Sequence, residues 1–238
     1  MAKQKNKVIL LAGPQGSGNH LWSKVFAMHP DVSGWDDLLD TSDPNNYFIR
    51  HYMEPSADIW ENIDDITVDI MDDKNYKVIS ASIPVWNYDK FYIIPVEKLE
   101  KKLTLLGIDF QLVVIGRDRN ILTVQQTRLR GGPSWGTATQ YIRRVKREPF
   151  FVSTELLYLY GPRYLQSISK LLDFPIAYDD PRLADIIKID ENEKYITYAE
   201  NPDIDAFSKA QPTPEEVAAK YEHLRAKKEV KKLLRGGK

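Results

Sequence analysis

The chain of 238 residues contains no cysteine, which excludes disulfide bonds, thiolate nucleophiles and cysteine-ligated zinc or iron–sulfur sites. Its four histidines are not spaced as metal ligands, and no apolar run approaches the length of a membrane span. Neither sign of charge is in excess: 33 lysines and arginines against 34 aspartates and glutamates leave a net charge of −1. The polar N-terminus, MAKQKNK, has no signal-peptide core. These absences predict a cytoplasmic protein without a metal, a nucleic-acid partner or a membrane partner.

The most informative stretch that is present runs from Lys7 to Val32. Residues 8–12 are apolar and predict a buried strand, and apolar residues at helical spacing follow from Leu21. The glycine-rich turn between them places backbone N–H groups and the positive end of the helix dipole at one point, which favours a phosphate. The predicted phosphate loop consists of Gly13, Pro14, Gln15, Gly16, Ser17, Gly18, Asn19 and His20.

The spacing of Gly13 and Gly18 is that of a Walker A loop. Asn19 and His20, however, stand where the lysine that holds a triphosphate and the hydroxyl that binds magnesium should be. The loop therefore predicts a phosphate site that does not hydrolyse ATP.

Further apolar stretches alternate with helical patterns along the chain. The predicted strands are residues 77–82, 110–115 and 150–153, and the predicted helices include 97–106, 137–147, one ending at Arg130 and one ending at Leu172. This alternation predicts a three-layer α/β/α fold with a central parallel sheet, as in P-loop NTPases. Residues 186–189 and 194–198 flank an acidic turn and predict a peripheral hairpin. A capping-box start at Thr213 predicts a basic C-terminal helix and tail, 213–238, after a main domain of residues 1–212.

Three stretches together resemble the P-loop sulfotransferases, which use the sulfuryl donor PAPS. The first, GPQGSGNHLWSKVFAMHPDV, is similar to the family's opening loop, helix and His-Pro-Asp-Val-like turn. The second, VVIGRDRNILTVQQTRLR, is similar to the strand and helix that hold the 3′-phosphate of PAPS. The third, FFVSTELLYLYGPRYLQSISKLLDFPI, is similar to a later strand and helix. They occur in family order over residues 7–176, in a register nearest to the tyrosylprotein and carbohydrate branch.

The resemblance implies transfer of a sulfuryl group from PAPS to a hydroxyl acceptor such as a glycan, with PAP as product and no metal. It implies that residues 13–20 bind the 5′-phosphosulfate and that Arg117 and Gln125 bind the 3′-phosphate. Arg117 also directly follows a predicted strand, at the edge where open α/β sheets bind ligands, and a guanidinium binds phosphate bidentately. The alternative for Arg117 is a surface ion pair with Asp118 or a neighbouring acidic residue.

The resemblance also implies two catalytic residues. Asp37 matches the catalytic glutamate of the tyrosylprotein branch and is the predicted general base, because an attacking hydroxyl must lose its proton. The alternative is a solvated acidic loop. His20 is predicted to assist the leaving group, and the alternative for it is a helix cap or a packed side chain.

Three departures from the family pattern leave rival functions open. Gly16 stands where the family has arginine or lysine, Ser82 stands where the cytosolic branch has its catalytic histidine, and Gln125 replaces a serine. One alternative is therefore a catalytically degenerate relative that binds a nucleotide or glycan. The other is a nucleotide or small-molecule kinase with an atypical P-loop, which Asn19 and His20 disfavour.

Overall fold

The computed structural model describes residues 6–34, 59, 62–87, 90–92, 94–130 and 132–188. They belong to the first of two compact units into which the chain divides, Met1–Asn192 and Glu193–Lys238. The predicted boundary at residue 212 and the predicted C-terminal helix lie outside the described residues. In the described part of the chain, every helix is too short or too polar to span a bilayer.

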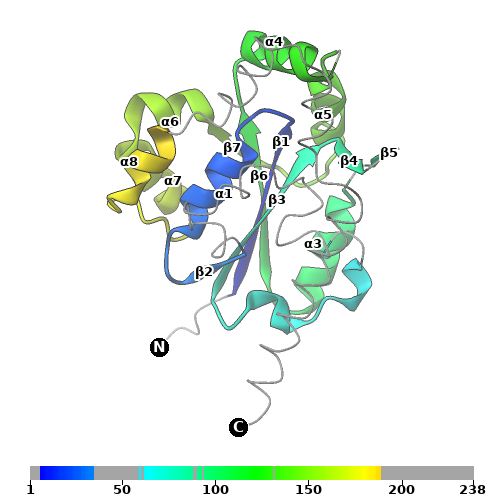
Figure 1. Ribbon diagram of the computed structural model, residues 1–238. Helices are drawn as coiled ribbons and strands as arrows, with labels where there is room; N and C mark the ends of the chain where they lie inside the picture. Colours follow the sequence, from blue (N-terminus) through cyan, green and yellow to red (C-terminus); the bar gives the residue numbers. More distant parts are fainter. Residues whose placement is uncertain are drawn as a thin grey trace, which may run out of the picture. The chain divides into compact units, whose positions relative to one another are not determined.

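A five-stranded parallel sheet forms the centre of this unit, in the order β2-β3-β1-β6-β7 (Figure 1). Its strands are β1 (Lys7–Pro14), β2 (Val32–Ser33), β3 (Tyr76–Ile83), β6 (Asp109–Gly116) and β7 (Phe150–Ser153). In the central register, Leu10 of β1 pairs with Ile79 of β3 and with Leu112 of β6. Because helices cover both faces of such a sheet, β1 is continuously apolar from Val8 to Ala12 instead of alternating.

The other described elements flank the sheet or connect its strands. The α-helices are α1 (Asn19–Ala27), α3 (Val96–Leu105), α4 (Arg119–Arg130), α5 (Trp135–Ile142), α6 (Thr154–Tyr160), α7 (Pro162–Leu172) and α8 (Arg182–Lys188). Two 3₁₀ turns, η4 (Ile63–Asp65) and η5 (Val68–Met71), precede β3, and β4 (Val85–Asn87) pairs antiparallel with β5 (Lys90–Tyr92).

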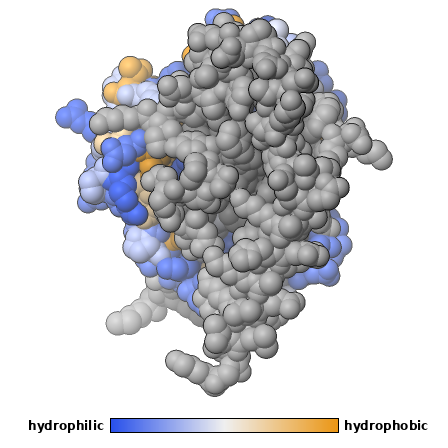
Figure 2. Space-filling model, viewed as in Figure 1, coloured by the Kyte–Doolittle hydropathy of each residue, from blue (hydrophilic) through white to orange (hydrophobic). Residues whose placement is uncertain are grey.

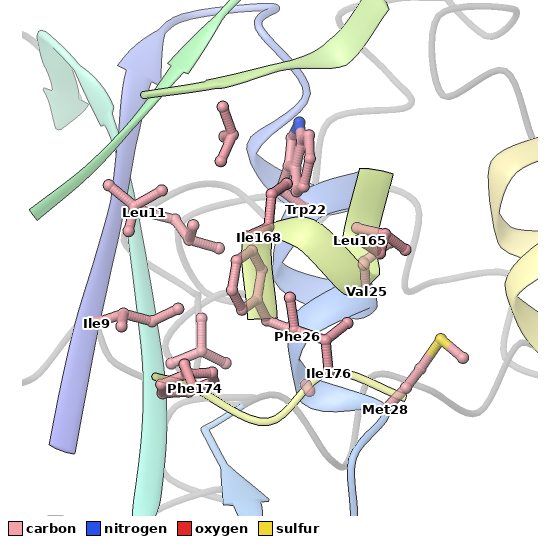
Figure 3. Packing of buried hydrophobic residues seen from close by; sticks show 14 of the residues in the cluster. Ile9, Leu11, Trp22, Val25, Phe26, Met28, Leu165, Ile168, Phe174 and Ile176 are labelled. Carbon is pink, nitrogen blue, oxygen red and sulfur yellow. The ribbon is translucent and has the colours of Figure 1, made fainter. Parts of the chain in front are cut away.

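Two apolar clusters, one on each face of the sheet, make up the core. On one face Ile9 and Leu11 of β1 pack with Trp22, Phe26 and Phe174 (Figure 3). The rings of Phe26 and Phe174 meet edge to face, with centroids 5.6 Å apart. On the other face the alternate β1 residues pack with α3 and α5, as the period of two along a strand requires. The predicted three-layer α/β/α fold is thereby confirmed.

The predicted strands are also confirmed, but the predicted hairpin is wrong in its first strand. Residues 182–188 form helix α8, and residues 194–198 lie outside the described residues. Leu183 and Ile186, three positions apart, are both buried in the cluster around Trp22. That spacing fits one helix face, and the β-branched isoleucines at 186 and 187 suggested a strand because the sequence window was too short to decide.

The outer surface carries apolar side chains on α6. Leu156 and Leu159 of this helix are exposed, and the apolar colour at the upper left of Figure 2 lies over it. Elsewhere on this face of the described chain, polar residues predominate (Figure 2).

Candidate functional site

The loop between β1 and α1 is held from outside by three side chains. Each donates a hydrogen bond to a different one of three consecutive loop carbonyls: Gln126 Nε2 to Gln15 O at 2.6 Å, Arg117 Nη1 to Gly16 O at 2.7 Å, and Thr154 Oγ1 to Ser17 O at 2.8 Å. The donors come from the ends of β6 and β7 and from α4, so the loop conformation depends on three separate parts of the fold.

With its carbonyls engaged, the loop retains unused N–H donors. The Ser17 N–H donates to Pro14 O at 3.0 Å and closes the turn. No described residue accepts a hydrogen bond from the N–H of Gly16 or Gly18. Gly18 is the N-cap of α1 and adopts a left-handed conformation, with φ of 102°. Unpaired loop amides at the N-terminus of a helix form a site for an anion.

Arg117 adds positive charge to this site. It directly follows β6, and its guanidinium reaches the Gly16 carbonyl. The alternative of an ion pair with Asp118 does not occur, because Asp118 Oδ1 instead accepts hydrogen bonds from the N–H groups of Asn120 and Ile121, at 2.8 and 3.1 Å, and caps α4. One of five guanidinium donors is used on the loop, and the others are suited to a phosphate.

Gln125, the other predicted 3′-phosphate residue, lies against the same part of the loop. A Cβ placed on Gly16 would come within 3.0 Å of Gln125 Oε1. The structure therefore brings Arg117 and Gln125 together at Gly16, and a larger residue at position 16 would displace Gln125.

Asn19 and Ser82, two of the unusual residues, are partners in the structure. Asn19 Nδ2 donates to Ser82 Oγ at 2.7 Å, and Ser17 Oγ donates to Asn19 Oδ1 at 3.3 Å. All three side chains are buried. The Asn19 amide is thus directed to the end of β3, and the backbone N–H is the group that this residue offers to an anion.

The remaining predicted site residues lie as follows. Gly13 and Pro14 end β1, and His20 is half-buried at the second position of α1. Asp37 lies outside the described residues. Within the described ranges no group of three or more His, Asp or Glu side chains is placed to hold a metal ion.

Sequence reasoning missed two of the three side chains that hold the loop. Thr154 Oγ1 accepts from Trp22 Nε1 at 3.1 Å as well as donating to Ser17 O, and all three residues are buried. The position of Thr154, at the carboxyl end of a predicted strand, was the available signal. Gln126 carries no comparable signal.

Next to this contact, the Tyr164 hydroxyl accepts from the Ser153 N–H at 2.9 Å. Burial raises the pKa of Tyr164, so its phenol is neutral at physiological pH.

Comparison with known proteins found a similar solved structure but no matching family model. No family model matches the chain, and no curated protein matches it. Among solved structures, it is similar to the mouse sulfotransferase SULT7A1 complexed with PAP, with 16% sequence identity and a TM-score of 0.42. The match covers 79% of this chain and 64% of the mouse protein, which is less than two thirds of its length. At that identity and score, the likeness does not bear on the activity of this chain.

Proposed function

We propose that the chain is a PAPS-dependent sulfotransferase that transfers a sulfuryl group to a hydroxyl acceptor. The observation that carries the proposal is the loop itself: its carbonyls at Gln15, Gly16 and Ser17 are held by side chains, while the amides of Gly16 and Gly18 have no partner among the described residues. Such a loop suits a phosphate. Since Asn19 and His20 supply neither a triphosphate lysine nor a magnesium hydroxyl, a donor that reacts without metal fits better than ATP.

The proposed chemistry assigns each step to residues of this chain. Asp37 takes the proton of the acceptor hydroxyl as its oxygen bonds to sulfur. The bond between sulfur and the bridging oxygen breaks, and the electron pair remains on the phosphate of PAP. The Gly16 and Gly18 amides and His20 stabilise that developing charge, as preorganised donors do. Arg117 and Gln125 bind the 3′-phosphate.

A second candidate is a relative that binds PAP or a glycan without transferring sulfuryl. The buried contact between Asn19 and Ser82 favours it, because the position of the cytosolic branch's histidine base is here a hydroxyl already engaged with the loop. Gly16 favours it too, since it places no cation within the loop.

Titration calorimetry with PAP, ADP and ATP, each with and without magnesium, tests the proposal. We expect PAP to bind most tightly and independently of magnesium. Magnesium-dependent ATP binding would instead identify a kinase, and the absence of binding by all three would reject a nucleotide site.

Replacement of Arg117 by alanine should weaken PAP binding at least tenfold. A charge-assisted contact to phosphate contributes about 1.5–3 kcal/mol. Adenosine 5′-phosphosulfate, which lacks the 3′-phosphate, should lose far less affinity. Loss of the hydrogen bond from Arg117 to Gly16 O should affect the binding of both ligands equally. The ratio of the two losses in affinity therefore isolates the contribution of Arg117 to binding of the 3′-phosphate.

Arg163→Ala, on the exposed side of α7, is the matched control and should bind both nucleotides normally. Equal losses of the two ligands in Arg117→Ala would remove Arg117 from the 3′-phosphate site.

A further inference from the structure

A buried glutamine, Gln126, fixes the direction of one amide of the phosphate loop. Gln126 is 1% exposed, and its Nε2 donates to Gln15 O at 2.6 Å. The Gln15 C=O and the Gly16 N–H belong to the same trans peptide unit, in which the two groups point in opposite directions. A donor that holds the carbonyl on one side of the loop therefore directs the Gly16 N–H to the other side.

The orientation of the Gln126 amide is itself fixed at its other end. Its Oε1 accepts from the backbone N–H groups of Ser134, at 2.7 Å, and Trp135, at 3.0 Å. Two backbone donors require an oxygen at that position, so the nitrogen of the amide must face the loop. The backbone at the start of α5 thus determines, through one side chain, which way the peptide unit 15–16 faces.

Thr154 fixes the direction of a second loop amide. Its Oγ1 accepts from Trp22 Nε1 at 3.1 Å and donates to Ser17 O at 2.8 Å. An indole N–H only donates and a hydroxyl has a single proton, so the Thr154 proton must be the one directed at Ser17 O. The Ser17 C=O shares a trans peptide unit with the Gly18 N–H, which therefore points to the opposite side of the loop.

The third held carbonyl differs from these two. Arg117 donates to Gly16 O, and the N–H of that peptide unit is the N–H of Ser17. This N–H is already used, because it donates to Pro14 O at 3.0 Å. The contact of Arg117 therefore stabilises the turn, whereas the other two contacts direct the two amides that have no partner among the described residues.

Both arrangements are chains of hydrogen bonds with the same polarity. One chain leads from backbone N–H groups of α5 through Gln126 to the peptide unit 15–16, and the other from the Trp22 indole through Thr154 to the peptide unit 17–18. In a buried chain each bond polarises the next, so the last amide proton becomes a stronger donor. Because both chains end on amides beside the N-terminus of α1, an anion bound there is the acceptor that completes them.

We propose that Gln126 and Thr154 are positioning residues for the anion of the loop: Gln126 sets the Gly16 amide, and Thr154 sets the Gly18 amide. Neither side chain has to contact the ligand, since each acts through a peptide unit. That the anion is the 5′-phosphate of PAP rests on the proposed function, but the positioning applies to any anion that the loop binds.

The test is a ¹H–¹⁵N NMR titration of the full chain with PAP and, separately, with inorganic pyrophosphate. An amide proton that donates to an anion moves downfield, and we expect both the Gly16 and the Gly18 signals to do so. In Gln126→Glu, which keeps an acceptor oxygen but has no proton for the loop, the Gly16 shift at saturation should be largely lost and the Gly18 shift retained. In Thr154→Val, which keeps the shape but lacks the hydroxyl, the pattern should be reversed.

Affinities and a matched control separate positioning from general stability. Each variant should bind PAP about tenfold more weakly, because one of the two amides no longer contacts the anion. Thr154→Ser, which restores the hydroxyl, should recover both the affinity and the Gly18 shift. Ser33→Ala is the control: Ser33 is 1% exposed and donates to Met71 O at 3.2 Å, away from the loop. It should lower the unfolding temperature and leave both glycine shifts unchanged.

Equal loss of the two shifts in both variants, or no change in either, would overturn the inference. If one variant does not fold, the other still shows whether a single amide is affected, and Thr154→Ser shows whether the hydroxyl is responsible. PAP binding without the crossed pattern would reject the positioning alone. The crossed pattern with pyrophosphate, in a chain that does not bind PAP, would reject the sulfotransferase and retain the positioning. A chain in which neither ligand shifts either amide would overturn both.

Discussion

We expect Gly18→Val to weaken PAP binding by about a hundredfold or more while the fold is retained. Gly18 has φ of 102°, where a residue with a Cβ is strained by about 1–2 kcal/mol and a β-branched one by more. A Cβ there would also lie 3.3 Å from Thr154 Oγ1. Thr154 holds the Ser17 carbonyl, so the substitution disturbs both the amide at position 18 and the contact that shapes the loop. Calorimetry with PAP and circular dichroism measure the two effects.

Gly107→Val is the matched control. Gly107 also has a positive φ, of 71°, but a Cβ there meets no atom within 4 Å, and it follows α3. This variant should lose stability through the same backbone strain and keep its PAP affinity. If Gly18→Val retained PAP binding, the phosphate site would lie elsewhere in the chain.

Turnover should fall by about 10²–10⁴-fold in Asp37→Asn, because that is the usual contribution of a general base. The amide keeps the size and polarity of the side chain but does not take up a proton, so PAP affinity should change little. Asp36→Asn should have a milder effect if Asp37 alone reaches the acceptor hydroxyl. The measurement is kcat with labelled PAPS, after a screen of sugars and phenols has found an acceptor.

Two other results would change the mechanism. Full activity of Asp37→Asn on a validated acceptor would make the base another residue, with His20 and His51 as the next candidates. Tight PAP binding without sulfation of any acceptor would mean that the chain has kept the phosphate site and lost the chemistry. The absence of a loop cation at Gly16 would then be the first explanation to test.

The features that the sequence by itself determined are those encoded in one continuous stretch. The order of β1, the glycine-rich loop and α1 can be predicted from the sequence, because each is encoded within a short stretch of the chain. An apolar run predicts the strand, the glycine spacing predicts the loop, and apolar residues at helical spacing predict the helix. The parallel sheet follows in the same way, since β1, β3 and β6 each contain a largely apolar, buried run and alternate with helices. The position of Arg117 at the end of β6, beside the loop, was also predictable, because it directly follows an apolar run.

Contacts between residues that are far apart in the sequence were decided by the tertiary structure alone. Thr154 reaches Ser17 across 137 positions, and Gln126 reaches Gln15 across 111. The local sequence around these residues does not predict either contact, because the two partners meet only after separate strands have paired in the sheet. Likewise, the hydrogen bond from Asn19 to Ser82 engages the side-chain amide of a loop residue that was predicted to contact a ligand. Local periodicity thus determined where the glycine-rich loop is. Long-range packing decided which of its hydrogen-bonding groups remain unpaired, because hydrogen-bond partners are set only once the strands are assembled.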